Sequence, residues 1–338
     1  MRLTDTVSGA PAAAMLGMCK NAGKTTAMNA LIRDFPESGV LCVTSIGRDG
    51  ESRDLVTGTD KPSVWIREGM LAATAKDLLP LCDVSREILA ATGIYTSLGE
   101  VIIFRARSGG FVQLAGPSIV DQLGRLRQML EPFAVDQLLI DGALSRKSPL
   151  SAVPDGVCIL STGAALDRDM DTVTAETAFT AELLCLPAFS GKFSPDGEDG
   201  SPGNPFGKVR IRHADGREEQ VNRPAEIRTP SAEDSIVFPG ALTESHAREL
   251  LRNRAVRPGV TIAVRDSSCL LLKRDTFAAL IRREVRFAVK NPAHLAAVTV
   301  NPVSPEGWRF DPDEFLEKMG AAVRVPVLDI LRETGRCG

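Results

Sequence analysis

Close to its N-terminus the chain carries the run Met18-Cys19-Lys20-Asn21-Ala22-Gly23-Lys24-Thr25-Thr26. A glycine, four free positions and then Gly-Lys-Ser/Thr at the start of a helix form the pattern of a phosphate-binding loop, or P-loop. Gly23-Lys24-Thr25 matches this pattern, whereas Met18 stands at the first glycine position and Gly17 lies one place earlier. Apolar residues precede the run and a helix-like segment, 26–33, follows it. The run therefore predicts a strand, a phosphate-binding loop and a helix in succession.

Each part of this loop has an expected role. Its backbone N–H groups and the helix N-terminus offer positive potential to phosphate oxygens. Lys24 is expected to reach the terminal phosphates of a nucleotide, and the Thr25 hydroxyl to bind Mg²⁺. The expected nucleotide-binding residues are Lys20, Asn21, Ala22, Gly23, Lys24, Thr25 and Thr26. The alternative is an ordinary turn with a solvated lysine, which the flanking strand and helix patterns disfavour.

Composition limits the class of protein. A chain of 338 residues has room for two domains, and 43% hydrophobic with 25% charged residues is typical of soluble globular proteins. The net charge of −3 disfavours a nucleic-acid partner. No apolar run approaches the roughly 20 residues of a membrane span, and the N-terminus lacks a signal-peptide pattern. We therefore expect no membrane partner and a cytoplasmic location. The seven cysteines include no C-x-x-C pair, which gives little support to disulfides or zinc.

Apolar runs alternate with helix-length segments through the first half of the chain. Those typical of buried strands are 40–44, 101–104, 138–140 and 157–160. Continuous apolar strands separated by helices indicate a parallel sheet with helices on both faces. The expected fold class is therefore α/β, with a P-loop nucleoside-triphosphatase domain at 1–188.

Glycine and proline then concentrate between Ser190 and Pro205, which indicates a linker or an exposed loop. Alternating residues at 208–221 around Asp215-Gly216 suit a hairpin, so 189–232 is interpreted as a linker with a hairpin. A second alternation follows, with helices at 242–254 and 275–283 and strands at 260–264, 285–289 and 295–300. We therefore expect 233–338 to form a second, smaller C-terminal α/β domain.

A carboxylate at the end of another buried strand would complete a nucleotide site. The run Leu138-Leu139-Ile140-Asp141-Gly142 supplies that arrangement. Asp141 is expected to hold Mg²⁺ directly or through water, together with Thr25. A strand-terminal aspartate that caps the next turn is the competing interpretation, and the loop upstream favours the metal role.

Two further carboxylates, Asp49 and Glu51, follow the strand at 40–44. Ligands sit outside the carboxyl ends of strands in an open parallel sheet. Asp49 and Glu51 are thus candidates to position Mg²⁺ or the attacking water, and with Lys24 they form the expected catalytic set. An ordinary surface loop would have the same composition. For Lys61 a solvated side chain is favoured over a phosphate contact.

The segment 161–165, Ser-Thr-Gly-Ala-Ala, follows the last strand of the expected first domain. Many P-loop proteins place a base-contacting loop there. The segment lacks the Asn/Thr-Lys-x-Asp sequence by which GTPases read guanine, so ATP is favoured over GTP. Histidines are few and no Gly-x-Ser-x-Gly elbow occurs. The chemistry indicated is nucleotide hydrolysis or phosphoryl transfer.

The run at 20–26 resembles the P-loops of the SIMIBI class, especially those of the molybdopterin-guanine-dinucleotide adaptor proteins. Counted from Gly17, the five-residue gap to Gly23 is similar to that of dethiobiotin synthetase. Both resemblances cover only the loop and its flanks. Lys20 does not stand at the second position, where the intersubunit lysine of this class usually lies. The chain could still form a homodimer. The position of Lys20 disfavours a role in which it contacts the nucleotide of the partner subunit.

A longer resemblance covers most of the chain. Its segments, in order, look like the P-loop subunit (KamB) of the reactivating factor for adenosylcobalamin-dependent lysine 5,6-aminomutase. They include Thr44-Ser45-Ile46-Gly47, Thr96-Ser97-Leu98-Gly99, Ile140-Asp141-Gly142-Ala143, Pro239-Gly240-Ala241-Leu242-Thr243 and Val300-Asn301-Pro302. The resemblance implies an accessory protein that couples ATP hydrolysis to the exchange of damaged cobalamin in a partner aminomutase. It also implies a second reactivase subunit.

Two rival functions remain open at this point. One is an ATP-dependent ligase or kinase of a small carboxylate, like dethiobiotin synthetase. The other is a nucleotide-binding adaptor for cofactor insertion, with negligible turnover. In each case ATP and Mg²⁺ are the expected ligands, and the second domain is expected to recognise the partner or substrate.

Overall fold

The structure, a computed structural model, describes residues 1–46, 64–142, 156–191, 193, 208–228, 230–333 and 335. The chain forms two units, one of Met1–Ala181 together with His294–Gly338 and one of Glu182–Ala293. Unit 2 is therefore an insertion between two parts of unit 1. This differs from the division expected from the sequence, in which 233–338 formed one C-terminal domain.

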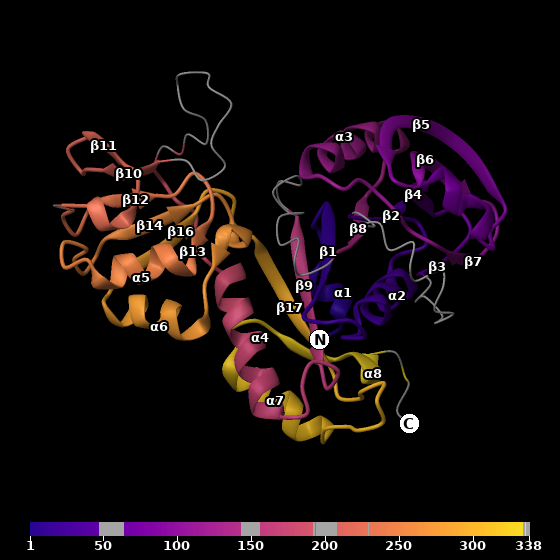
Figure 1. The fold of residues 1–338 in the computed structure, drawn as a ribbon. Coiled ribbons are helices and arrows are strands. Elements are labelled where there is room, and N and C mark those ends of the chain that lie inside the picture. The colour runs from indigo at the N-terminus through magenta and orange to yellow at the C-terminus, as the bar shows by residue number, and fades with distance from the viewer. Residues whose placement is uncertain are drawn as a thin grey trace. The chain divides into compact units, whose positions relative to one another are not determined.

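Unit 1 is built on a nine-stranded sheet with the order β18-β17-β9-β1-β8-β2-β4-β6-β5 (Figure 1). Its strands are β1 Ala12–Gly17, β2 Leu41–Ser45, β4 Leu71–Ala75, β5 Arg86–Thr96, β6 Gly99–Ala106, β8 Gln137–Asp141, β9 Val157–Gly163, β17 His294–Asn301 and β18 Val327–Asp329. From β18 to β4 every neighbouring pair is parallel, and β6 and β5 add antiparallel pairs. The protein is thus a mixed α/β protein with a large, mostly parallel sheet.

The antiparallel end of this sheet is a correction to the sequence interpretation. The apolar run 101–104 was expected to be one of the parallel strands, yet β6 pairs antiparallel with both β4 and β5. Only two residues separate β5 from β6, and a parallel connection needs a crossover of about a dozen residues or more. A small separate ribbon pairs β3, Val64–Ile66, with β7, Gly110–Val112.

The helices of unit 1 lie on both faces of the sheet. They are α1 Leu3–Thr6, α2 Lys24–Asp34, α3 Val120–Leu130, α4 Met170–Leu184, which continues into unit 2, α7 Pro312–Ala322 and α8 Ile330–Glu333. Figure 1 shows α1 and α2 on one side of the central strands and α4 and α7 on the other. Lys318 of α7 contacts Asp171 of α4, with 2.9 Å between Nζ and Oδ1. The stretch predicted as strand, loop and helix is observed as β1, 18–23 and α2.

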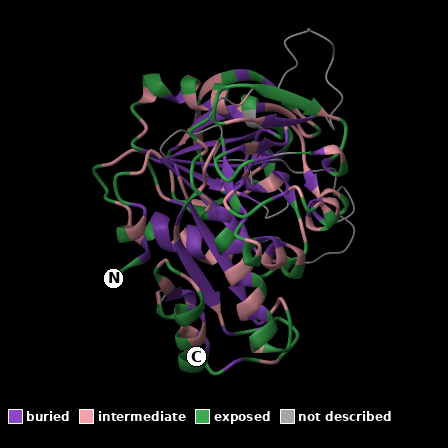
Figure 2. Cartoon of the chain, turned by 90° about the vertical axis from the view of Figure 1, so that its left-hand side faces the viewer, coloured by how far each residue is buried: buried purple, intermediate pink, exposed green. Residues whose placement is uncertain are grey.

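The core of unit 1 joins residues from both ends of the chain. β1 is buried along its whole length, and Figure 2 shows the central strands buried throughout. One apolar cluster contains Met15 of β1, Leu31 of α2 and Leu139 of β8. It also contains Ala297 of β17 and Ile330 of α8. Burial of this shared surface is why the segment after unit 2 belongs to unit 1.

Unit 2 is a smaller α/β unit with a five-stranded sheet of order β11-β10-β12-β14-β16. Its elements are β10 Val209–Arg212, β11 Glu218–Val221, β12 Ser235–Val237, β13 Leu242–Thr243, α5 Glu244–Arg252, β14 Thr261–Val264, β15 Leu270–Leu271, α6 Arg274–Arg282 and β16 Arg286–Val289. The expected hairpin is confirmed as the antiparallel pair β10–β11. Thr243 caps α5, since its side chain accepts a hydrogen bond from the backbone N–H of His246.

Short 3-10 helices cover Lys76–Leu81, Glu131–Phe133, Pro224–Glu226 and Ser267–Cys269. Among the helices of the described ranges, none combines the length and apolar character needed to cross a bilayer.

A buried carboxylate, Asp234, organises the start of the unit 2 sheet. It accepts hydrogen bonds from the backbone and hydroxyl of Ser231 and from the backbone N–H of Ala214, and lies 2.8 Å from Nδ1 of His213. Burial alone would raise the pKa of Asp234, but these hydrogen bonds outweigh it and hold the pKa below its ordinary value. The ionised carboxylate therefore stabilises the folded state.

We expect an Asp234→Ala variant to lose roughly 3 kcal/mol of the free energy of unfolding at neutral pH, because it leaves several buried donors without an acceptor. Since the folded pKa is lowered, the contribution is complete above the unfolded pKa and is lost as pH falls through the folded pKa. Urea unfolding should therefore show the difference from wild type shrinking in acid. The exposed Asp215, paired with Arg217, gives a matched Asp215→Ala control with little effect. A deficit that does not change with pH would contradict this assignment.

Candidate functional site

The carboxyl ends of five adjacent parallel strands meet at one edge of the large sheet. In spatial order β17, β9, β1, β8 and β2 end at Asn301, Gly163, Gly17, Asp141 and Ser45. Met15 lies opposite Asp141, and Gly17 lies opposite Ser161. Open α/β sheets bind ligands outside these ends. This edge is therefore the candidate site, and it places the loop after β1 beside the end of β8.

The loop 18–23 has the backbone geometry of a concave turn. Asn21 and Gly23 have φ of 63° and 97°, both in the left-handed region. Gly23 is the N-cap of α2, so a side chain there would be strained. The backbone N–H of Met18 donates to the carbonyl of Ser161 at 2.9 Å, which ties the loop to β9. Turns of this kind at a helix N-terminus point N–H groups toward anions.

Lys24, the first residue of α2, folds its side chain back over Gly17. A Cβ atom at Gly17 would lie 2.6 Å from Cδ and 2.8 Å from Cγ of Lys24. Only a residue without a side chain leaves this space free. The Lys24 side chain thus explains why a glycine, Gly17, stands one place earlier than the usual pattern requires.

Asp141 presents a buried oxygen that lacks a hydrogen-bond partner. This atom is Oδ1, and no donor reaches it within the part of the chain that the structure describes. Burial raises the pKa of Asp141, and the nearby positive charge of Lys24 lowers it in part. An unsatisfied buried carboxylate oxygen is costly, which favours a ligand that pairs with it.

These residues fit a magnesium ion. Mg²⁺ takes oxygen ligands, and it is usually held by one or two carboxylates with substrate phosphates and waters completing the shell. Asp141 and the hydroxyl of Thr25, in the first turn of α2, are the side chains that would hold it. Within the described ranges no group of three or more His, Cys, Asp or Glu side chains forms a denser metal site.

The remaining expected residues are distributed as follows. Lys20 and Asn21 are exposed, Ala22 is buried, and Thr26 is partly buried in the first turn of α2. Burial raises the pKa of the Cys19 thiol, and Lys24 lowers it in part. The expected catalytic carboxylates and one lysine lie outside the described residues, namely Asp49, Glu51 and Lys61.

Asn301 is a residue of this edge that was not among the predicted nucleotide-site residues. Its side-chain Nδ2 donates to the carbonyl of Asn21 at 3.4 Å, and its own carbonyl accepts from the N–H of Ala164 at 2.9 Å. A side chain at Gly163 would collide with that carbonyl. The signal was present, since Asn301 follows an apolar run just as Asp141 does. Asn301 was assigned to the C-terminal domain, because a local sequence pattern does not show which strands become neighbours in a sheet.

The segment 114–118 crosses the end of β2. The N–H of Gly116 donates to the hydroxyl of Ser45 at 2.9 Å. A side chain at Gly116 would collide with the carbonyl of Ser45. A residue without a side chain is therefore required at this crossing.

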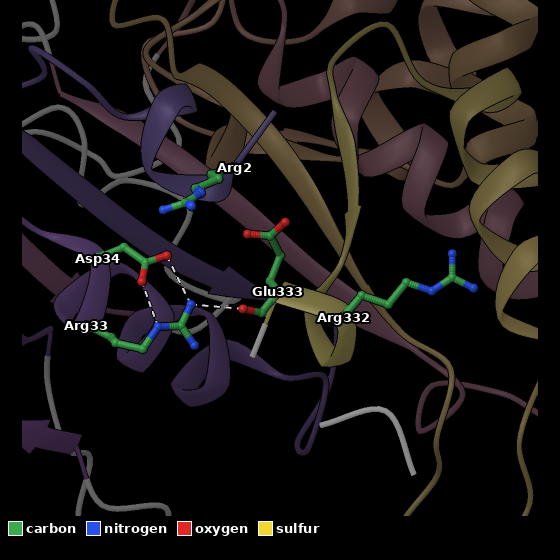
Figure 3. A pocket seen from close by; sticks show the side chains of 5 residues that line it. All are labelled: Arg2, Arg33, Asp34, Arg332 and Glu333. Carbon is green, nitrogen blue, oxygen red and sulfur yellow. Dashed lines mark hydrogen bonds and ion pairs between the residues drawn. The ribbon is translucent and has the colours of Figure 1, made fainter. Parts of the chain in front are cut away.

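A cavity of about 340 Å³ lies elsewhere in unit 1, at the opposite end of α2 (Figure 3). It is lined by Arg2, Arg33, Asp34, Arg332 and Glu333. Arg33 pairs with Asp34 at 2.6 Å and donates to the carbonyl of Glu333 at 2.9 Å, and Arg332 points away from them. Its charges are thus largely satisfied within the protein.

No family model matches the chain, and no match is found among curated proteins or solved structures. The fold places the chain in the class of mixed α/β proteins with a large, mostly parallel sheet. Its function is therefore inferred from the site residues and from the resemblances in sequence.

Proposed function

We propose that the chain is a Mg²⁺-dependent P-loop nucleoside triphosphatase that prefers ATP. One observation carries this proposal. Lys24, at the N-terminus of α2, folds over Gly17 and lies near the buried Oδ1 of Asp141, which has no hydrogen-bond partner within the described ranges. A cation, helix-end N–H groups and an unpaired carboxylate oxygen together suit a metal-bound polyphosphate.

In this proposal each group of residues has its own role. The N–H groups of 18–23 and Lys24 bind and orient the phosphates, and Thr25 with Asp141 holds the ion. When bound, Mg²⁺ neutralises charge on the phosphate oxygens. Asp49 or Glu51 orients the attacking water. The preference for ATP is supported by the lack of a guanine-reading sequence at 161–165.

The resemblance to the aminomutase reactivase supports a finer proposal. In it, ATP hydrolysis drives exchange of damaged cobalamin in an adenosylcobalamin-dependent aminomutase, together with a second reactivase subunit. Unit 2 is the part that recognises the partner, and the nucleotide state switches that contact. The support for this finer proposal is the order in which the resembling segments occur along the sequence.

A pull-down from native extract, with and without ATP, tests it. We expect an aminomutase to be recovered with the purified chain, in an amount that depends on the nucleotide. Recovery of no aminomutase in either condition would count against the reactivase. Phosphate release that requires a small carboxylate would instead favour a ligase or kinase, and tight ATP binding without release would favour an adaptor.

A further inference from the structure

The segment that follows unit 2 returns to the loop 18–23 and touches it at two points. The first is Asn301, at the end of β17, and the second is Ile330, at the start of α8. A Cβ atom at Gly23 would lie 3.4 Å from Cγ2 of Ile330 and 3.6 Å from Cβ of Asn301. Two residues of the segment after unit 2, Asn301 and Ile330, thus lie beside the loop, and the hydrogen bond from Asn301 spans 280 positions of the chain.

The orientation of the Asn301 amide is fixed by its neighbours. Its Oδ1 accepts a hydrogen bond from the N–H of Val303 at 3.1 Å, so Nδ2 faces the carbonyl of Asn21. An amide turned the other way would set two acceptors against each other. The backbone of Asn301 is held in turn by the hydrogen bond from Ala164.

Asn21 is the residue in the loop whose backbone conformation needs support. Its φ of 63° is left-handed, which is uncommon for residues other than glycine. In this conformation its carbonyl accepts the hydrogen bond from Nδ2 of Asn301. A donor on that carbonyl therefore stabilises the loop in its anion-binding form.

We infer that Asn301 is a positioning residue for the phosphate loop, acting through the carbonyl of Asn21. The inference rests on the proposed nucleotide site and adds a residue from the far end of the chain to it. Asn301 touches no phosphate itself. At 3.4 Å the hydrogen bond is long, so its effect on affinity is modest.

The test uses the full chain and two variants, Asn301→Asp and Asn301→Ala, with ATP and inorganic tripolyphosphate as probes in the presence of Mg²⁺. Calorimetry should show affinity for both probes falling about fivefold in Asn301→Ala, as expected for one hydrogen bond. Asn301→Asp should lose more at neutral pH, because an ionised carboxylate repels the Asn21 carbonyl. Its deficit relative to wild type should shrink as pH falls toward the carboxyl pKa, where the protonated group can donate.

Asn253 supplies the matched control, because its Nδ2 also donates to backbone carbonyls, those of Pro224 and Ile227 in unit 2. Asn253→Asp should lower thermal stability and leave affinity for tripolyphosphate unchanged. Folded Asn301 variants that bind both probes as wild type does would overturn the inference. An Asn301→Asp deficit that is the same at every pH would also do so. If the wild-type protein binds neither ATP nor tripolyphosphate, the result contradicts the proposed nucleotide site itself rather than the role of Asn301.

Discussion

A Lys24→Ala variant is expected to hydrolyse ATP about 10²- to 10³-fold more slowly than wild type, because it lacks the cation that we propose binds the terminal phosphates. The fold should be retained, since Lys24 is not fully buried and its stem lies over Gly17 rather than in the core. Release of inorganic phosphate under saturating Mg²⁺ and ATP measures the rate, and far-UV circular dichroism checks the fold. Undiminished hydrolysis in the variant would remove Lys24 from the site.

A Gly17→Ala variant tests the same lysine without deleting it. The added methyl group occupies the space of Cδ and Cγ of Lys24 and must displace the stem. We expect the rate to fall in the same direction but by a smaller factor. Gly320→Ala, in α7, is the matched control, because a Cβ there meets nothing within 4 Å. A Gly17→Ala rate equal to that of the control would contradict the observed course of Lys24.

An Asp141→Asn variant should change activity and stability in opposite directions. Loss of the carboxylate that we propose holds Mg²⁺ is expected to lower the rate of hydrolysis by about 10²-fold or more. The nucleotide-free protein should be at least as stable as wild type at neutral pH. Its buried Oδ1 has no partner among the residues that the structure describes, so ionisation at this position is a cost to the folded state.

The sign of the pH effect follows from the pKa of Asp141, which burial raises and Lys24 lowers only in part. A carboxyl whose pKa is raised on folding binds its proton more tightly in the folded state. Wild type therefore loses stability as pH rises from the unfolded pKa to the folded pKa, and the full penalty remains above it. Thermal melts of Asp141→Asn should not show this decline with pH. Added Mg²⁺ and ATP should raise the stability of the wild-type protein but not that of the variant.

Asp136, just before the amino end of β8, is the control for this variant. Its Oδ2 accepts a hydrogen bond from the backbone N–H of Val40 at 2.7 Å, so its carboxylate is partnered where that of Asp141 is not. Asp136→Asn should leave hydrolysis unchanged. If Asp141→Asn hydrolyses ATP at the wild-type rate, the ion is held by other residues.

The local part of the fold could be predicted because its signals are contiguous. β1, the loop 18–23 and α2 follow from one run of residues, and Asp141 follows from an apolar run with a carboxylate at its end. The antiparallel hairpin β5–β6 could not be predicted in this way. Most of β5 is exposed or half-exposed, and its short apolar run, 88–91, does not show with which strand it pairs or in which direction. Periodicity reports burial, and it does not report strand direction.

The part of the site that the sequence did not predict depends on pairing across the whole chain. β17 joins β9 after an insertion of a complete unit, and Thr299 Oγ1 donates to Ser161 Oγ across a separation of 138 residues. Asn301 comes to the loop only through that pairing. An apolar run at 295–300 predicts a strand, but which sheet the strand enters is decided by the surface it buries.

The insertion of unit 2 has a consequence for the order in which the protein can fold during synthesis. The ribosome completes Glu182–Ala293 before it begins β17 and β18. Until then β9 has an unpaired side, and the apolar cluster lacks Ala297, Leu328 and Ile330. Unit 2 thus has its full sequence available for folding first, although unit 1 was started first. A nascent chain stopped at residue 188 would expose the β9 edge, which is a template for unwanted pairing with other chains.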